Sequence, residues 1–134
     1  MNEIYAGKIC PYCKAKTSFV NSNLIYQQSY GMIYICFECD AYVGCHKGTD
    51  KSKGSLANRS LRKLRNKAHS VFDPLWKAKM IRDGCSQSKA RNAAYDWLSR
   101  ELGIQRELTH IAMFDDQQCH SVIELCSQFY KRKP

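Results

Sequence analysis

The sequence predicts a single α+β domain of 134 residues, in which N-terminal β-hairpins pack on a C-terminal bundle of about four helices. Three observations lead to this fold class. Five of the eight cysteines lie in residues 1–46, among short runs of β-branched and aromatic residues that are typical of strands. Residues 55–131 carry apolar side chains at helical spacing instead. The polar and basic residues 47–54 between them have the composition of a linker.

The first part contains four segments with strand character. Asn21-Ser22-Asn23 and Ser29-Tyr30-Gly31 separate some of them and have the composition of turns. The segments hold too few apolar residues for an independent core, so we expect this part and the helices to form one domain. The predicted strands are Thr17–Val20, Leu24–Tyr26, Met32–Ile35 and Ala41–Val43.

The helices are predicted from their start and stop signals. Asp73 followed by Pro74 resembles an N-cap with proline at the first helical position, and Asp115 with Gln118 resembles a capping box. These signals divide the second part into four helices: from a cap at Ser55 to about Ser70, from Pro74 to Arg82, from Ser86 or Ser88 to Gly103, and from Asp115 to about Lys131.

Two Cys-x-x-Cys pairs are the strongest chemical signal, and 22 residues separate them. A two-residue gap lets both thiolates of a pair reach one ion about 2.3 Å from each sulfur, and two pairs complete a tetrahedron. Such a closed site stabilises structure and does not activate water, and its binding energy would replace the missing core. We therefore predict a zinc-ribbon-like first part with one zinc ion, bound by Cys10, Cys13, Cys36 and Cys39.

The other cysteines have different interpretations. Redox dithiols come singly within an α/β pattern, and disulfides are disfavoured because no secretory signal is visible at the N-terminus. Cys45 or His46 could replace a ligand or contribute to a second site, and the sequence leaves this open. Cys119 and Cys126 lie on an apolar helix face and are predicted to be core residues, whereas Cys85 is an incidental thiol.

The charge is concentrated in one segment. The chain has 21 basic and 12 acidic residues, a net charge of +9, and residues 47–67 hold eight basic residues and one acidic residue. A basic strip on the linker and first helix could follow phosphates, and aromatic rings could stack on unpaired bases. The predicted strip is Lys51, Lys53, Arg59, Arg62, Lys63 and Lys67, and the candidate rings are Tyr26, Tyr30, Tyr34, Phe37 and Tyr42.

Several of these motifs occur together in a known family. The relevant segments are Cys10-Pro11-Tyr12-Cys13, Cys36–Thr49, Leu61–Arg65 with Ala68-His69, Phe72–Trp76, His110–Asp115 and Val122–Cys126. From Cys10 to Cys126 the chain resembles a family of small bacterial and phage proteins described as a zinc-finger-containing domain of unknown function. The resemblance implies a zinc site at the four paired cysteines and helices that belong to the same unit, but no activity. Ala15 stands where we expect glycine after the first pair.

The favoured function is a non-catalytic, zinc-dependent nucleic-acid-binding protein. The alternative is a phage-type inhibitor or adaptor that binds a host protein complex. A nuclease is less favoured, because the acidic residues are scattered and the predicted metal site is closed. No apolar stretch approaches the roughly 18 residues of a membrane span, so we expect a cytoplasmic protein without a membrane partner. DNA or RNA preference, oligomeric state and pathway stay open.

Overall fold

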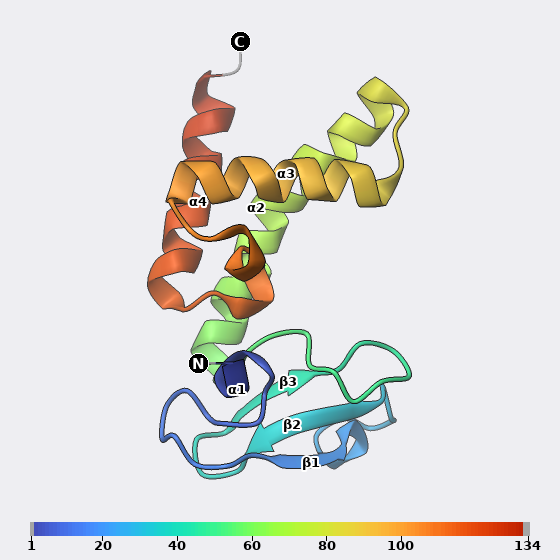
Figure 1. Ribbon diagram of the computed structural model, residues 1–134, viewed down its shortest axis with the longest axis vertical. Coiled ribbons are helices and arrows are strands. Elements are labelled where there is room, and N and C mark those ends of the chain that lie inside the picture. The colour runs from blue at the N-terminus through green and yellow to red at the C-terminus, as the bar shows by residue number, and fades with distance from the viewer. Residues whose placement is uncertain (1, 133–134) are drawn as a thin grey trace. The chain divides into compact units, whose positions relative to one another are not determined.

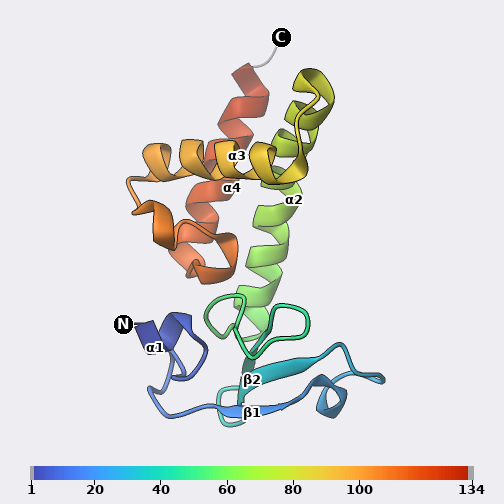
Figure 2. The same ribbon diagram turned by 45° about the vertical axis from the view of Figure 1, so that its right-hand side comes forward.

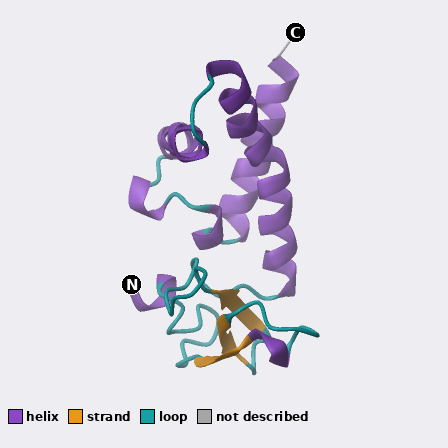
Figure 3. Cartoon of the chain, turned by 90° about the vertical axis from the view of Figure 1, so that its right-hand side faces the viewer, coloured by secondary structure: helices purple, strands orange, loops and turns teal. Residues whose placement is uncertain are grey.

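The computed structural model describes residues 2–132, which divide after Arg62 into two compact units. Each unit is described separately. The strands lie in the first unit, and the long helices lie in the second, apart from the first turn of one helix (Figure 3). The predicted α+β class is confirmed.

The first unit is built on a three-stranded antiparallel sheet of order β1-β2-β3 (Figure 1). A short helix, α1 (Asn2–Tyr5), precedes the sheet. The strands are β1 (Ser18–Asn21), β2 (Met32–Cys36) and β3 (Ala41–Gly44), so three of the four predicted strands are confirmed to within about one residue.

The predicted strand Leu24–Tyr26 is wrong. Ser22–Leu24 forms a turn of 3-10 helix, η1, which Asn21 caps. The Asn21 side chain accepts a 2.9 Å hydrogen bond from the backbone N–H of Asn23. Asparagine and serine offer the backbone such local partners in place of a strand ladder, and here the local bonds prevail over β-propensity.

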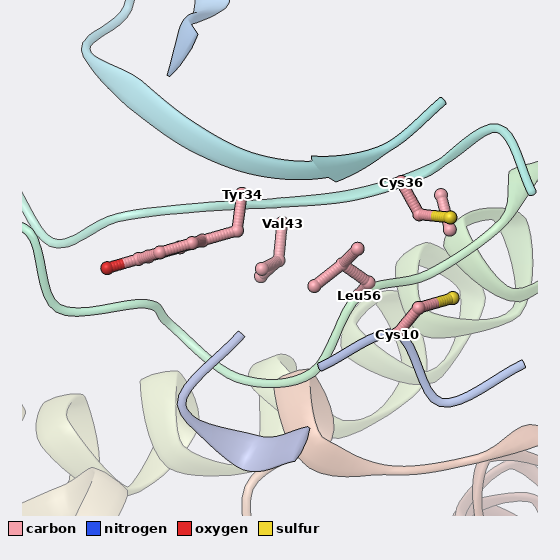
Figure 4. Packing of buried hydrophobic residues seen from close by; sticks show 6 residues of the cluster. Cys10, Tyr34, Cys36, Val43 and Leu56 are labelled. Atoms are coloured by element: carbon pink, nitrogen blue, oxygen red, sulfur yellow. The ribbon is translucent and has the colours of Figure 1, made fainter. Parts of the chain in front are cut away.

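The core of the first unit is small and includes two of the paired cysteines. Alternate residues of β2 and β3 point to one face of the sheet, where Leu56 covers them. Figure 4 shows the sulfur atoms of Cys10 and Cys36 at one end of this cluster and the ring of Tyr34 at the other. The buried cluster consists of Cys10, Tyr34, Cys36, Ala41, Val43 and Leu56.

The residues after β3 form a loop that is bonded to the sheet. The hydroxyl of Tyr34 donates a 2.6 Å hydrogen bond to the carbonyl of Asp50, and the N–H of Lys53 donates one of 2.9 Å to the carbonyl of Gly44. Farther along, Ala57 and Tyr42 exchange two backbone hydrogen bonds of 3.1 Å. The basic segment before the helices therefore has a defined conformation.

The second unit contains most of α2 (Arg59–Asp83), together with α3 (Gln87–Leu102) and α4 (Asp116–Arg132). Helix α3 crosses α2 and α4, as Figures 1 and 2 both show. Two 3-10 turns, η2 (Arg106–Leu108) and η3 (Ile111–Met113), connect α3 to α4. Within residues 2–132, none of the helices has the length and apolar composition that a membrane span requires.

The core of the second unit confirms the predicted role of two cysteines. Cys119 and Cys126 are fully buried on α4, and burial raises the pKa of each thiol to about 11. Both are therefore neutral at physiological pH and pack as small hydrophobic residues. Their buried neighbours in the unit include Ala68, Phe72, Tyr95, Leu98, Ile111, Phe114 and Val122.

Two helix boundaries differ from the prediction. Helix α2 begins at Arg59, because Asn58 rather than Ser55 accepts the capping bond, from the N–H of Leu61 at 3.0 Å. The helix then continues through Pro74 without a break. Asp73 is therefore not an N-cap but lies inside the helix, where its carboxylate accepts a 3.1 Å bond from the indole N–H of Trp76.

The signals at the other helix ends are confirmed. Ser86 caps α3 by accepting from the N–H of Lys89, and Gly103 ends the helix with a left-handed φ of 66°. Asp115 and Gln118 form the predicted capping box, with reciprocal bonds of 3.0 and 2.9 Å.

Gly7 is the position at which a single methyl group should most disturb the first unit. Its φ is +80°, and a Cβ there would lie 3.0 Å from Cβ of Ser52 and 3.1 Å from the ring of Tyr34. We expect Gly7→Ala to lower the free energy of unfolding of this unit by about 1–3 kcal/mol. Amide hydrogen exchange of β2 and β3 would measure the loss.

The matched control is Gly44→Ala. A methyl group at Gly44 would meet no heavy atom within 4 Å, and this residue does not adopt a positive φ. Equal exchange rates in the two variants would contradict the close approach at Gly7.

Candidate metal centre

The two Cys-x-x-Cys pairs converge on one point. The Sγ atoms of the four cysteines all lie within 4.8 Å of one another, and those of Cys13 and Cys36 are 3.7 Å apart. A tetrahedral ion with bonds of about 2.3 Å places its ligand sulfurs about 3.8 Å apart, whereas a disulfide needs about 2.0 Å. All four cysteines are free thiols. The arrangement therefore fits one four-coordinate metal ion and not a pair of disulfides.

Each cysteine pair lies in a tight turn, and the residue after the second cysteine of each pair has a left-handed backbone conformation. Lys14 follows Cys13 with a φ of 66°, and Asp40 follows Cys39 with a φ of 50°. The N–H of Lys14 bonds to the carbonyl of Cys10 at 2.9 Å, which closes the first turn. The position that favours glycine is thus residue 14, one residue before the Ala15 of our expectation.

Hydrogen bonds and burial affect the four thiols differently. A backbone hydrogen bond from Ala15, followed by one with Cys36, lowers the pKa of Cys13. Burial raises the pKa of Cys36, and burial with the neighbouring thiols raises that of Cys39 to about 12. Four adjacent thiolates repel one another, so complete ionisation needs a cation at their centre.

The site lies at the edge of the core. Cys10 is fully buried and Cys36 nearly so, whereas Cys13 is exposed and Cys39 is half-buried. An ion can therefore enter from the solvent side. Four protein ligands complete a tetrahedral shell and leave no position for water or substrate, which suits a structural metal.

Cys45 and His46 lie outside the group of ligands. In residues 2–132, the four paired cysteines form the only group of His, Cys, Asp or Glu side chains arranged to hold a metal ion. Cys45 packs against the buried cluster of the first unit, and burial raises the pKa of its thiol. The N–H of His46 bonds to the carbonyl of Lys51.

The residues of the predicted basic strip have two kinds of environment. Five are exposed, and within the described part of the chain none of them forms an ion pair with an acidic side chain. Two lie in the loop after β3 and one at the start of α2, all in the first unit, whereas the last two lie farther along α2 in the second unit. In chain order they are Lys51, Lys53, Arg59, Lys63 and Lys67.

Arg62 has a structural role that the sequence did not indicate. Its Nη1 donates to the carbonyl of Ala57 at 2.7 Å and lies 3.4 Å from that of Asp40, which follows the second cysteine pair. The guanidinium carbon also lies 4.0 Å from the centre of the Tyr42 ring. Arg65 is buried, and its Nε donates to the carbonyl of Phe114 at 3.0 Å within the second unit. Neither arginine is the simple solvated charge that composition suggests.

The candidate stacking residues also differ in their exposure to solvent. Tyr26, Tyr30 and Phe37 are exposed, whereas Tyr34 is buried and bonded to the loop after β3. The expectation that Tyr34 presents a ring to a ligand is therefore wrong. Strand alternation was the missed signal, because Tyr34 is two residues from the buried ligand Cys36 and so shares its face.

A four-cysteine metal centre on a small antiparallel sheet defines a zinc-finger type of protein. Over residues 6–129 the chain matches the family described as a zinc-finger-containing domain, and it belongs to that family. No curated protein and no solved structure matches the chain.

Metal content tests the ligand set. Purified protein should contain about one metal ion per chain, as four ligands predict. Cys36→Ser should lose most of this metal and unfold the first unit, because Cys36 is also a core residue. Cys85→Ser, outside the group, is the control and should retain the ion. Full metal occupancy in Cys36→Ser would exclude the proposed ligands.

Lys14, the left-handed residue after the first cysteine pair, offers a substitution that should stabilise the first unit instead of unfolding it. Lys14→Gly should stabilise the first unit by about 1 kcal/mol, because a residue with a Cβ is strained at a φ of 66°. Competition with a chelator should show correspondingly tighter metal binding. Lys16→Gly is the control, since Lys16 pairs with Ile9 in an extended bridge and should lose stability. A loss in both variants would contradict the strain at residue 14.

Proposed function

We propose that the protein is a non-catalytic zinc protein that binds nucleic acid. Four thiolates in tetrahedral spacing are the donor set that zinc adopts in structural sites. The zinc ion would hold the first unit together and take no part in a reaction, because the protein fills its coordination shell.

The nucleic-acid proposal rests on the exposure of six basic side chains in residues 47–67 and on their lack of acidic partners within the described part of the chain. Eight of the residues 47–67 are basic, and six of these side chains are exposed. Within residues 2–132, these six have no acidic partner. Exposed, uncompensated cations at this density favour a polyanion, and phosphates are the most general such partner. The six are Lys47, Lys51, Lys53, Arg59, Lys63 and Lys67.

A charge-removal variant tests this proposal. Arg62 is retained because it bonds to backbone carbonyls, and Lys53, Arg59, Lys63 and Lys67 are changed together to glutamine. Affinity for both DNA and RNA should fall, and the slope of log affinity against log salt should flatten by up to about 0.7–0.9 per lost phosphate contact. Stability should change little, because each exposed substitution costs under about 0.5 kcal/mol.

The control removes the same number of charges elsewhere. Lys77, Lys89, Arg100 and Lys131 are all exposed in the second unit, and their change to glutamine should leave the salt slope nearly intact. Equal effects of the two variants would show that only net charge matters. If the parent has no affinity for either nucleic acid at low salt, the proposal fails. The alternative, an inhibitor or adaptor that binds a host protein complex, then becomes the hypothesis to test.

A further inference from the structure

The first unit contains a groove beside β2 that is separate from the metal centre. Two cavities of about 490 and 750 Å³ have four lining residues in common and so adjoin one another. These volumes lie in the range of small-molecule and cofactor pockets. The shared residues are Tyr30, Met32, Cys45 and Lys53.

Three tyrosines form one side of the smaller cavity and hold one another in place. The ring of Tyr26 meets those of Tyr30 and Tyr42 edge to face, with centres 5.4 and 6.2 Å apart. The hydroxyls of Tyr26 and Tyr42 share a 3.1 Å hydrogen bond, which raises the pKa of Tyr26 to about 12 and keeps it neutral. The guanidinium of Arg62 stacks on Tyr42.

Tyr30 is the ring of this group that is most available to a ligand. The residue is 69% exposed, compared with 43% for Tyr26. Its backbone is fixed, because the N–H of Tyr30 donates a 2.7 Å bond to the hydroxyl of Ser22. An exposed ring on a fixed backbone is a preorganised stacking surface.

Basic side chains accompany the rings. Lys53 lines both cavities, and Lys47 and His46 line the larger one together with one acidic residue, Asp50. A flat ring beside a cation suits a nucleotide, whose base stacks while its phosphate pairs with the lysine. Tyrosine cages also bind quaternary ammonium groups, but Lys53 and Arg62 would repel such a ligand.

We propose that this groove binds unpaired nucleotides, with a base stacked on Tyr30 and a phosphate beside Lys53. The inference rests on the proposed nucleic-acid function and specifies its substrate as single strands. Bases in a duplex are already stacked and paired, so they cannot reach Tyr30 without melting. Charge alone would not produce this preference, because a duplex carries the denser phosphates.

The test uses the full zinc-loaded chain and a 12-nucleotide oligomer, single-stranded or annealed to its complement. The parent should bind the single strand more tightly than the duplex. Tyr30→Leu should weaken single-strand binding by about 5- to 100-fold, the range for loss of one stacked base, without a change in salt slope. Tyr30→Phe keeps the ring and should retain the affinity. Phe129→Leu removes an exposed ring of the second unit, outside the groove, and should have no effect.

A second readout locates the base directly. Irradiation of a 5-bromouracil oligomer bound to the parent should crosslink to Tyr30 or Tyr26, as mass spectrometry would show. Equal affinity for single strand and duplex, an unaffected Tyr30→Leu variant or crosslinks confined to the second unit would each overturn this inference. Those results would leave the charge-based function in place. Absence of all nucleic-acid binding in the parent would overturn both.

Discussion

Four thiols must meet at one point, and the first unit is organised around that requirement. Its buried cluster has six members, and two of them, Cys10 and Cys36, are also candidate metal ligands. A unit of about 60 residues buries little apolar area, so its core offsets the conformational entropy only narrowly. We therefore expect metal binding to be coupled to folding of this unit, with the ion completing the core.

The parts of the structure that follow from local geometry were predictable from the sequence. The Cys-x-x-Cys spacing predicted the cluster, because a two-residue gap brings both sulfurs to one ion whatever the surrounding fold. Composition misplaced a strand at Leu24–Tyr26 and a helix break before Pro74. Asn21 caps a 3-10 turn instead of preceding a strand, and the carboxylate of Asp73 bonds to Trp76 within the helix, neither of which composition shows. The hydrogen-bond partner of a polar side chain depends on its rotamer and its neighbours in the folded structure, so it cannot be derived from composition.

For the basic segment, the sequence likewise does not show which side chains are available to a ligand. Its charges can be counted in the sequence, but the structure separates two arginines that bind carbonyls from Arg59 and the lysines, which are exposed. Arg62 and Arg65 each donate to a backbone carbonyl, whereas Lys51, Lys53 and Lys63 are exposed. The guanidinium has five donors in a rigid planar fork and is weakly hydrated, so it is better suited than the lysine ammonium to bonding within a protein. Any interaction with phosphates would therefore depend on the lysines and Arg59.

The metal centre and the groove share the same two strands. Cys36 ends β2 at the metal centre, and Met32, at the other end of the strand, lines the groove. Tyr34 lies between them on the core face, and its bond to Asp50 fixes the loop that carries Lys53. We therefore expect loss of the ion to remove one end of this framework and to loosen the loop at the other. If the groove binds as proposed, a metal with no open coordination position would affect it without contacting it.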